Sequence, residues 1–268
     1  MTTLSYAVTD SATMLRRNLR HMIRYPSMTV MLIGMPVVLL LLFVYVFGGT
    51  LGAGLGDPGG GRGAYVDYVT PGILLMTVAS SAQGTAISVA TDMTEGIIAR
   101  FRTMSISRAS VLTGHVVGSL LQTMLSLAVV TGVAVLVGFR PTATAAEWIA
   151  AFGLLAAFTL AITWLSVALG LVSRSVETAS NLPMFLILLP FLGSGFVPTD
   201  SMPTAVRWFA EYQPFSPVIE TLRGLLLGTP IDANGALAAA WIVGIGLFGY
   251  VWRTACSSGA LPADADRK

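Results

Sequence analysis

The sequence predicts an all-α membrane protein with six transmembrane helices, and three observations support this fold class. Of its 268 residues, 54% are hydrophobic and 10% are charged, whereas about a quarter of the residues in a soluble domain are charged. The apolar residues gather in runs close to the roughly 20 residues that a helix needs to cross a bilayer. The arginines between these runs fall mostly on one side of the predicted membrane, as is typical of multi-pass proteins.

Residues 1–26 predict an amphipathic helix that lies in the membrane interface without crossing it. Its apolar stripe faces away from four arginines that would contact anionic headgroups: Arg16, Arg17, Arg20 and Arg24. Pro26 is expected to end this helix and start a new direction. The first residues are polar and arginine-rich, so no cleavable signal peptide is expected, and the first span would act as the insertion signal.

A single transmembrane domain is expected over residues 27–253. Its six predicted spans are 28–47, 69–91, 111–137, 148–172, 181–197 and 236–252. The fifth span is short and contains Pro183 and Pro190. We therefore expect it to pack inside the bundle, where neighbouring helices can satisfy the carbonyl groups that proline leaves free. A polar turn is expected over 173–180, and a polar tail over 254–268.

Residues 48–68 are expected to form a glycine-rich loop. Gly54, Gly56 and Gly59 have the spacing of a dinucleotide-binding loop. Pro58 and the lack of a strand before it and a helix after it exclude that context.

Residues 198–235 form the longest segment outside the spans, and short helices are expected there. Three aromatic residues favour a helix at the membrane interface: Trp208, Phe209 and Tyr212. Residues 218–227 are too short to span, so they either dip into the membrane edge or pack on the bundle. Glu220 and Arg223 would either gate an exit or pair with each other, and the structural pairing is favoured.

Residues 92–108 are a charged island between two apolar spans. On a helix, Met93, Ile97 and Phe101 share one face, while Asp92 and Glu95 lie on the other. Such a helix could dock into a groove on a soluble partner. A solvated loop whose arginines only set the topology fits the spacing equally well.

Counting arginine and lysine predicts that both termini are cytoplasmic. With the N-terminus inside, the inner segments hold eleven of these residues: Arg16, Arg17, Arg20, Arg24, Arg100, Arg102, Arg108, Arg174, Arg253, Arg267 and Lys268. The outer segments hold four: Arg62, Arg140, Arg207 and Arg223. This bias places residues 92–108 in the cytoplasm.

Several classes of function are disfavoured by missing residue types. The only lysine is Lys268, so the chain has no P-loop. Its histidines and cysteine, His21, His115 and Cys256, are too few and too scattered for a metal site or a catalytic site. No predicted span has an acidic residue near its centre, which argues against a proton relay. The interior polar groups, which are Ser, Thr, Gln83, Gln122 and Asn181, suit a hydrophobic or amphipathic passenger, or they serve only as interhelical hydrogen bonders.

Two stretches resemble the type 2 ABC transporter permeases, and most of all the daunorubicin-resistance membrane subunits. The first is Glu-Gly-Ile-Ile-Ala-Arg-Phe-Arg at 95–102 with Arg-Ala-Ser-Val-Leu-Thr-Gly at 108–114. The second is Phe-Val-Pro-Thr-Asp-Ser-Met-Pro at 196–203 with Gln-Pro-Phe-Ser-Pro-Val-Ile-Glu-Thr-Leu-Arg-Gly-Leu-Leu-Leu-Gly at 213–228. The sequence departs from the family pattern at two places. The departure at Met104 and Ser105 puts the end of the helix over 92–108 in doubt. The departure at His115 affects the expected contacts with lipid or a partner.

The resemblance implies a separate cytoplasmic ABC ATPase that binds ATP and Mg, while this chain holds no cofactor. A coupling helix would meet that ATPase through Asp92, Glu95, Gly96, Arg100, Phe101 and Arg102. The arginines of the N-terminal helix would form a second contact nearby. The extracellular closing segment would include Pro198, Pro203, Pro214, Pro217, Glu220 and Arg223. Two permease chains, identical or related, would assemble in the bilayer, and no nucleic-acid partner is expected.

The function expected from this resemblance is ATP-driven export of hydrophobic drugs or lipid-like molecules across the plasma membrane of a bacterium. Export of a polysaccharide or lipid-linked glycan is an alternative, although the aromatic residues of the spans are scattered. A non-transporting membrane scaffold is a third. Co-purification with a P-loop ATPase distinguishes the transporters from the scaffold.

Overall fold

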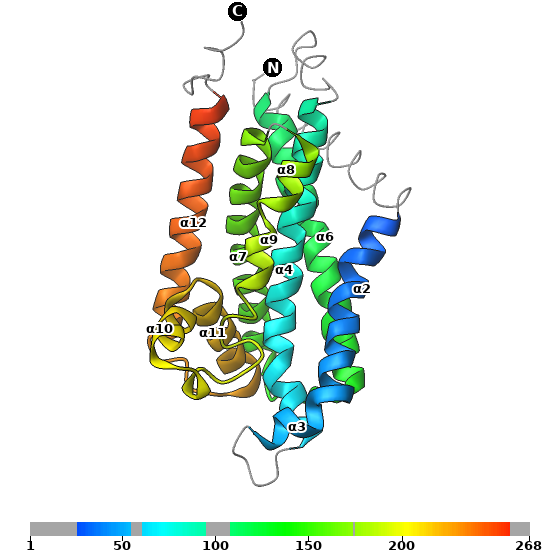
Figure 1. Ribbon diagram of the computed structural model, residues 1–268, viewed down its shortest axis with the longest axis vertical. Coiled ribbons are helices and arrows are strands. Elements are labelled where there is room, and N and C mark those ends of the chain that lie inside the picture. Colours follow the sequence, from blue (N-terminus) through cyan, green and yellow to red (C-terminus); the bar gives the residue numbers. More distant parts are fainter. Residues whose placement is uncertain (1–25, 55–60, 95–107, 174, 258–268) are drawn as a thin grey trace, which may run out of the picture.

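Long apolar helices stand side by side in the computed structural model, which describes residues 26–54, 61–94, 108–173 and 175–257 (Figure 1). Five segments are long and apolar enough to cross a membrane. They comprise α2 (Pro26–Leu42) continued by the π-helical turn η1 (Phe43–Phe47) and α3 (Gly48–Ala53), and then α4 (Arg62–Thr94), α6 (Arg108–Val137), α7 (Ala145–Val172) and α12 (Asn234–Ser257). None of the described residues lies in a strand. The all-α prediction is therefore confirmed for this part of the chain.

Helix α4 is the centre of the bundle. It packs against α2, α6 and α7. Within its most apolar stretch of 18 residues, 72% is buried inside the protein. The contact with α7 is close because Gly170 has no side chain: a Cβ there would lie 2.8 Å from the Ala86 carbonyl oxygen. Similarly, a Cβ on Gly249 of α12 would lie 2.6 Å from the Leu165 nitrogen of α7. Small residues thus bring these backbones together, as is common between membrane helices.

The predicted glycine-rich loop over 48–68 is wrong at both of its ends. Residues 48–53 form α3, and residues 62–68 form the first two turns of α4. Tyr65 and Val66 are fully or almost fully buried there, so tertiary packing outweighs the low helix propensity of the glycines around them. Gly54 follows the end of α3, while Gly56 and Gly59 lie outside the described residues.

The predicted fifth span does not form one continuous helix. Residues 181–197 contain only the last residue of α8 (Val176–Asn181), then α9 (Met184–Leu188) and turns over residues 189–196. Pro183 and Pro190 each lack a backbone N–H and clash with the preceding turn, which explains the breaks. Both helices pack beside α4 (Figure 1). The expected packing inside the bundle is wrong for α9, because none of its side chains is buried and Phe185 is 73% exposed, a position that suits contact with lipid. The polar turn expected over 173–180 is also largely helical, and Ser175 caps α8 by accepting a hydrogen bond from Thr178 N.

Three short elements connect this segment to α12. They are η2 (Thr199–Ser201), α10 (Thr204–Tyr212) and α11 (Phe215–Leu227). The short helix predicted around Trp208, Phe209 and Tyr212 is confirmed as α10, on which these three aromatic side chains are exposed. Of the two alternatives for α11, packing on the bundle is the one observed, because most of its side chains are buried against α4, α7 and α12.

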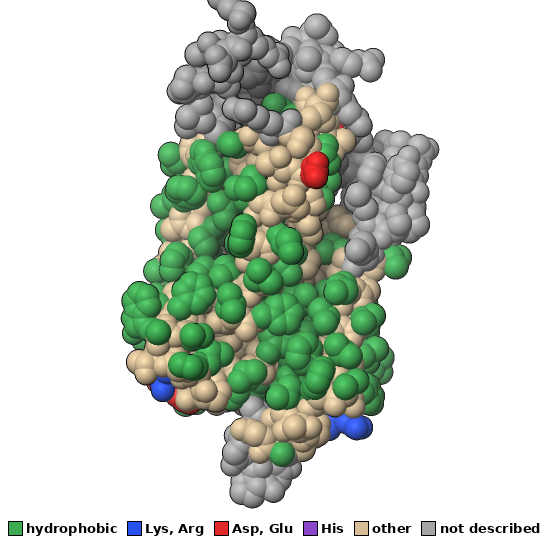
Figure 2. Space-filling model, viewed as in Figure 1, with side chains coloured by type: hydrophobic (Ala, Val, Ile, Leu, Met, Phe, Trp, Pro, Cys, Tyr) green, Lys and Arg blue, Asp and Glu red, His purple; other side chains and the backbone are tan. Residues whose placement is uncertain are grey.

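The outer surface is strongly apolar between its two ends. Among the described residues on the face in Figure 2, hydrophobic side chains cover much of the surface, and the few charged side chains lie in its upper part and at its lower edge. Exposed large hydrophobic residues occur on α2, α6, α10 and α12 and around α9. This distribution suits burial in lipid. The helix predicted over 1–26 and residues 95–107 of the predicted coupling helix lie outside the described residues. Pro26 is the first described residue and lies in α2, so the expected change of direction at this proline stays a prediction.

Candidate functional site

A buried arginine joins three elements at the end of the bundle where α3, α10 and α11 lie, which we call the α11 end (the lower end in Figure 1). Arg223 is 7% exposed. Its Nη1 donates to Glu220 Oε1 at 2.6 Å, and its Nη2 donates to the carbonyl oxygens of Tyr68 at 3.1 Å and Ser194 at 3.0 Å. The guanidinium carbon stands 4.0 Å from the centroid of the Tyr68 ring. These four residues are the Arg223 cluster.

The sequence of α4 explains why a helix carbonyl can bind an outside donor at this point. Pro71 has no N–H for the carbonyl of Asp67, and its ring disturbs the preceding turn. The carbonyl that Arg223 binds is the next one along, that of Tyr68, and a carbonyl oxygen has a second lone pair with which it can accept from an outside donor. Burying a guanidinium is costly unless its charge is paired and its donors are bound. Glu220, one turn away on the same helix, provides the opposite charge.

Side chains also satisfy the irregular backbone of residues 189–196. The Tyr68 hydroxyl donates to the Ser194 carbonyl at 2.9 Å. Ser194 N donates to Ser216 Oγ at 3.1 Å, and Gln213 Nε2 donates to the Leu189 carbonyl at 3.0 Å. Non-helical backbone at membrane depth requires such partners, because lipid supplies none. A Cβ on Gly193 would lie 2.3 Å from Gln213 Nε2, so a larger residue there would have to displace this side chain from its hydrogen bonds.

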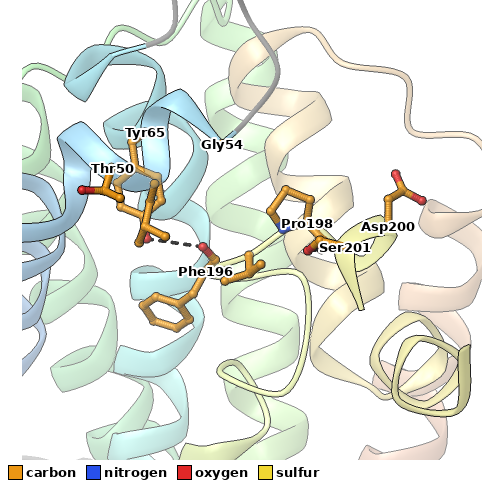
Figure 3. A pocket seen from close by; sticks show the side chains of 9 residues that line it. Thr50, Gly54, Tyr65, Phe196, Pro198, Asp200 and Ser201 are labelled. Atoms are coloured by element: carbon orange, nitrogen blue, oxygen red, sulfur yellow. Dashed lines mark hydrogen bonds between the residues drawn. The ribbon is translucent and has the colours of Figure 1, made fainter. Parts of the chain in front are cut away.

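A pocket of about 570 Å³ lies next to this segment (Figure 3). Its wall includes Tyr65 of α4, whose hydroxyl donates to the Phe196 carbonyl at 3.3 Å. Residues of α3 line one side, and Pro198, Asp200 and Ser201 line another. The Phe196 ring stacks on Phe191 with a centroid distance of 4.4 Å. The pocket, which we call the Phe196 pocket, therefore combines an apolar aromatic wall with a few polar groups.

The middle of the bundle contains polar but uncharged groups. Buried threonines and serines mostly donate to the carbonyl four residues earlier in their own helix, as Thr77 does to Ile73 at 2.9 Å. Gln83 Nε2 donates to the Ser180 carbonyl at 3.0 Å, which is an interhelical role. Among the described residues, only Asp92 and Arg223 are charged and buried, and each lies near one end of the bundle.

The predicted closing segment is brought together at the α11 end. Three of its prolines immediately precede short helices: Pro198 before η2, Pro203 before α10 and Pro214 before α11. Pro217 lies in the first turn of α11, where its missing N–H is tolerated. The predicted pairing of Glu220 with Arg223 is confirmed.

Most of the predicted ATPase contact is not described. Asp92 is buried near the end of α4 that lies opposite the α11 end. The remaining predicted contact residues lie outside the described residues: Arg16, Arg17, Arg20, Arg24, Glu95, Gly96, Arg100, Phe101 and Arg102.

Sequence reasoning missed the residues that hold the irregular segment. These are Tyr65, Tyr68, Ser194, Gln213 and Ser216. One signal was present, because Tyr65 and Tyr68 are three residues apart and lead into an apolar run, which favours a helix that begins before residue 69.

A family model described as ABC-2 type transporter matches residues 10–227, a range that contains the long α4, the predicted coupling segment and the whole Arg223 cluster. The chain belongs to the ABC-2 type transporter family. The match extends over both stretches on which the resemblance rested, apart from the last residue of the second. This ABC-2 permease is a membrane-embedded transporter component, not an enzyme.

Two relatives are permeases named for drug resistance. The ABC-2 permease is 27% identical over 240 residues to the daunorubicin resistance ABC transporter permease protein DrrB1 of Streptomyces coeruleorubidus, covering 89% of this chain and 80% of the relative. It is 25% identical over 180 residues to the probable doxorubicin resistance ABC transporter permease protein DrrC of Mycobacterium tuberculosis, covering 66% of this chain and 64% of the relative. Membership in this family implies an ATPase partner.

Proposed function

We propose that this chain is the membrane-spanning subunit of an ATP-driven exporter that moves hydrophobic drugs or lipid-like molecules out of a bacterial cell. This type of passenger is chosen because the middle of the bundle is uncharged. Among the described residues, the two buried charges lie only near its ends. Such an interior favours an amphipathic molecule over a small ion. The Phe196 pocket offers a passage or resting site of matching character near one end. The names of the relatives point to the same class of passenger.

The energy would come from a separate cytoplasmic subunit that binds ATP and Mg, because this chain has no P-loop lysine. That subunit would contact the segment 92–108 and the N-terminal arginines. Closure of its nucleotide sites would push on this segment and shift the permease pair between inward-open and outward-open states.

Helix α4 supplies a direct mechanical link for this motion. It is continuous over its 33 residues from Thr94, at the start of the coupling segment, to Arg62, beyond the Arg223 cluster. At about 1.5 Å per residue it extends roughly 50 Å. A tilt imposed near Asp92 would therefore move Tyr68 relative to Arg223 and Ser194, and would alter the contacts beside the Phe196 pocket.

The first test is a pull-down of the tagged chain from its native membranes, followed by an ATPase assay of the co-purifying proteins. We expect the wild type to retain an ATPase and the double variant Glu95→Ala, Arg100→Ala to lose it. The matched control is Arg207→Ala, Glu211→Ala, which removes an exposed arginine–glutamate pair on α10 at the α11 end. This control should retain the ATPase. Absence of any ATPase with the folded wild-type chain would favour a scaffold.

Phe101→Ala is expected to separate ATP hydrolysis from transport. The ATPase should still bind, because the charged residues remain, while efflux of a fluorescent amphipathic dye from the cells decreases. Efflux at the wild-type rate would exclude a coupling role for Phe101. Membrane insertion, measured by the amount of chain in purified membranes, should be unchanged.

A further inference from the structure

A second pocket at the α11 end, of about 480 Å³, lies among α4, the connection between α6 and α7, and α11. Its lining includes Asp67, Tyr68, Arg140, Thr142 and Arg223. The connection is held against α11 by the hydrogen bond from Thr142 N to the Leu226 carbonyl at 3.0 Å. We call this second pocket the Arg140 pocket. Its volume is in the range of small-molecule sites.

The Arg140 pocket contains charged groups of both signs. Arg223, buried in its wall, uses both terminal nitrogens in the Arg223 cluster, but its buried Nε has no hydrogen-bond partner among the described residues. Arg140 is exposed, and its backbone N–H donates to Asp67 Oδ1 at 2.8 Å. Because this Nε is covered by protein atoms, Arg223 contributes its positive charge to the wall of the pocket, and the exposed Arg140 is the arginine whose donors a ligand can reach.

The surroundings of the pocket favour a ligand that comes from the membrane. Arg140 follows the end of α6 by three residues, and Leu136 in the last turn of α6 is 87% exposed. Across the connection, Ile149 in α7 is 75% exposed. Both side chains belong to spans and suit contact with acyl chains. The two spans that flank the connection in sequence thus expose apolar side chains near their ends, which favours a headgroup whose acyl chains contact these spans.

We propose that the Arg140 pocket binds the headgroup of a phospholipid that carries a primary amine, as in phosphatidylethanolamine. The phosphate would accept hydrogen bonds from the Arg140 guanidinium, because arginine and phosphate form strong charge-assisted bonds. The ammonium group would approach the Asp67 carboxylate. A headgroup with only negative charge would be repelled by Asp67, and a choline has no N–H to donate. This lipid is a bound component of the permease, distinct from its passenger.

The test is quantitative extraction of lipids from the chain after reconstitution in nanodiscs of equal phosphatidylethanolamine, phosphatidylglycerol and phosphatidylcholine and transfer to detergent. The wild type should retain the ethanolamine lipid in preference to the other two. Arg140→Gln should lower its retention about tenfold, which corresponds to about 1.4 kcal/mol. Asp67→Asn keeps an acceptor for the backbone of Arg140 but loses the charge, so the preference over phosphatidylglycerol should disappear.

Arg62→Gln is the control, because Arg62 lies on the same helix and contacts the Tyr45 ring outside the Arg140 pocket. It should leave retention unchanged. Arg140→Lys should restore part of the retention lost in Arg140→Gln, which separates loss of charge from misfolding. Equal retention of the three lipids, preference for phosphatidylglycerol, or unchanged retention in Arg140→Gln would overturn the proposal. Displacement of the lipid by millimolar glycerophosphoethanolamine would overturn it in favour of a soluble ligand.

Discussion

Arg223→Gln is expected to lower the free energy of unfolding by about 3 kcal/mol, near the lower end of the range for breaking a buried ion pair. The lower end applies because Glu220 is 31% exposed and water can partly replace its partner. The variant also removes the donor that joins Tyr68 of α4 to Ser194. We expect a clear fall in the thermal unfolding midpoint in detergent, followed by tryptophan fluorescence, and a loss of export.

Arg207→Gln is the matched control for this prediction. Arg207 also pairs with acidic residues, Asp200 at 2.8 Å and Glu211 at 2.6 Å, but its side chain is 44% exposed. Exposed ion pairs contribute little because water screens them, so the midpoint should hardly change. Equal effects of the two variants would show that the burial of Arg223 has no special importance. Arg223→Lys should be intermediate, because lysine keeps the charge but cannot reproduce the fork of guanidinium donors.

Gly72→Ala is expected to have the second largest effect on stability. A Cβ at this position would lie 2.4 Å from the Gly195 carbonyl oxygen and 2.8 Å from its carbonyl carbon and Cα. These are backbone atoms that cannot rotate away, so α4 and the segment around Gly195 must separate. Overpacking of this kind costs about 1–3 kcal/mol. The separation would also strain the hydrogen bonds from Tyr65 and Tyr68 to this segment.

Gly84→Ala, on the same helix, should change the stability in the opposite direction and raise it. A Cβ at Gly84 meets no atom within 4 Å, and alanine is favoured over glycine in a helix by up to about 1 kcal/mol. The unfolding midpoint should therefore rise with Gly84→Ala and fall with Gly72→Ala. A rise in both variants would contradict the close contact between Gly72 and Gly195.

The long helices could be predicted because hydropathy is a property of contiguous sequence. The expected span 69–91 lies inside α4, and 236–252 lies inside α12. The ends were less predictable, since the burial of Tyr65 depends on Phe196, far along the chain. The two prolines of the fifth segment indicated an interruption, but its division into α8, α9 and turns depends on partners from α4 and α11.

In the candidate site, too, contacts between residues close in sequence could be predicted, and contacts between distant residues could not. Glu220 and Arg223 are three residues apart on one helix, so their pairing could be inferred from spacing. The contacts of Arg223 with Tyr68 and Ser194 cross 155 and 29 residues, respectively. No periodicity encodes such contacts. The Arg140 pocket was missed for the same reason, because its charged groups come from three separate segments.

The distance in sequence between Tyr68 and Arg223 has a consequence for biosynthesis. A ribosome adds about 5–20 residues per second, so α11 is made on the order of 10 s after the first turns of α4. The segment 189–196 is made only a few seconds before Gln213, Ser216 and Arg223, so for most of the interval it is Tyr65 and Tyr68 of α4 that lack the carbonyl groups to which they later donate. The α11 end is therefore completed late, and until then membrane chaperones and quality-control proteases would encounter an α4 whose tyrosine hydroxyl groups have not yet bound their partners.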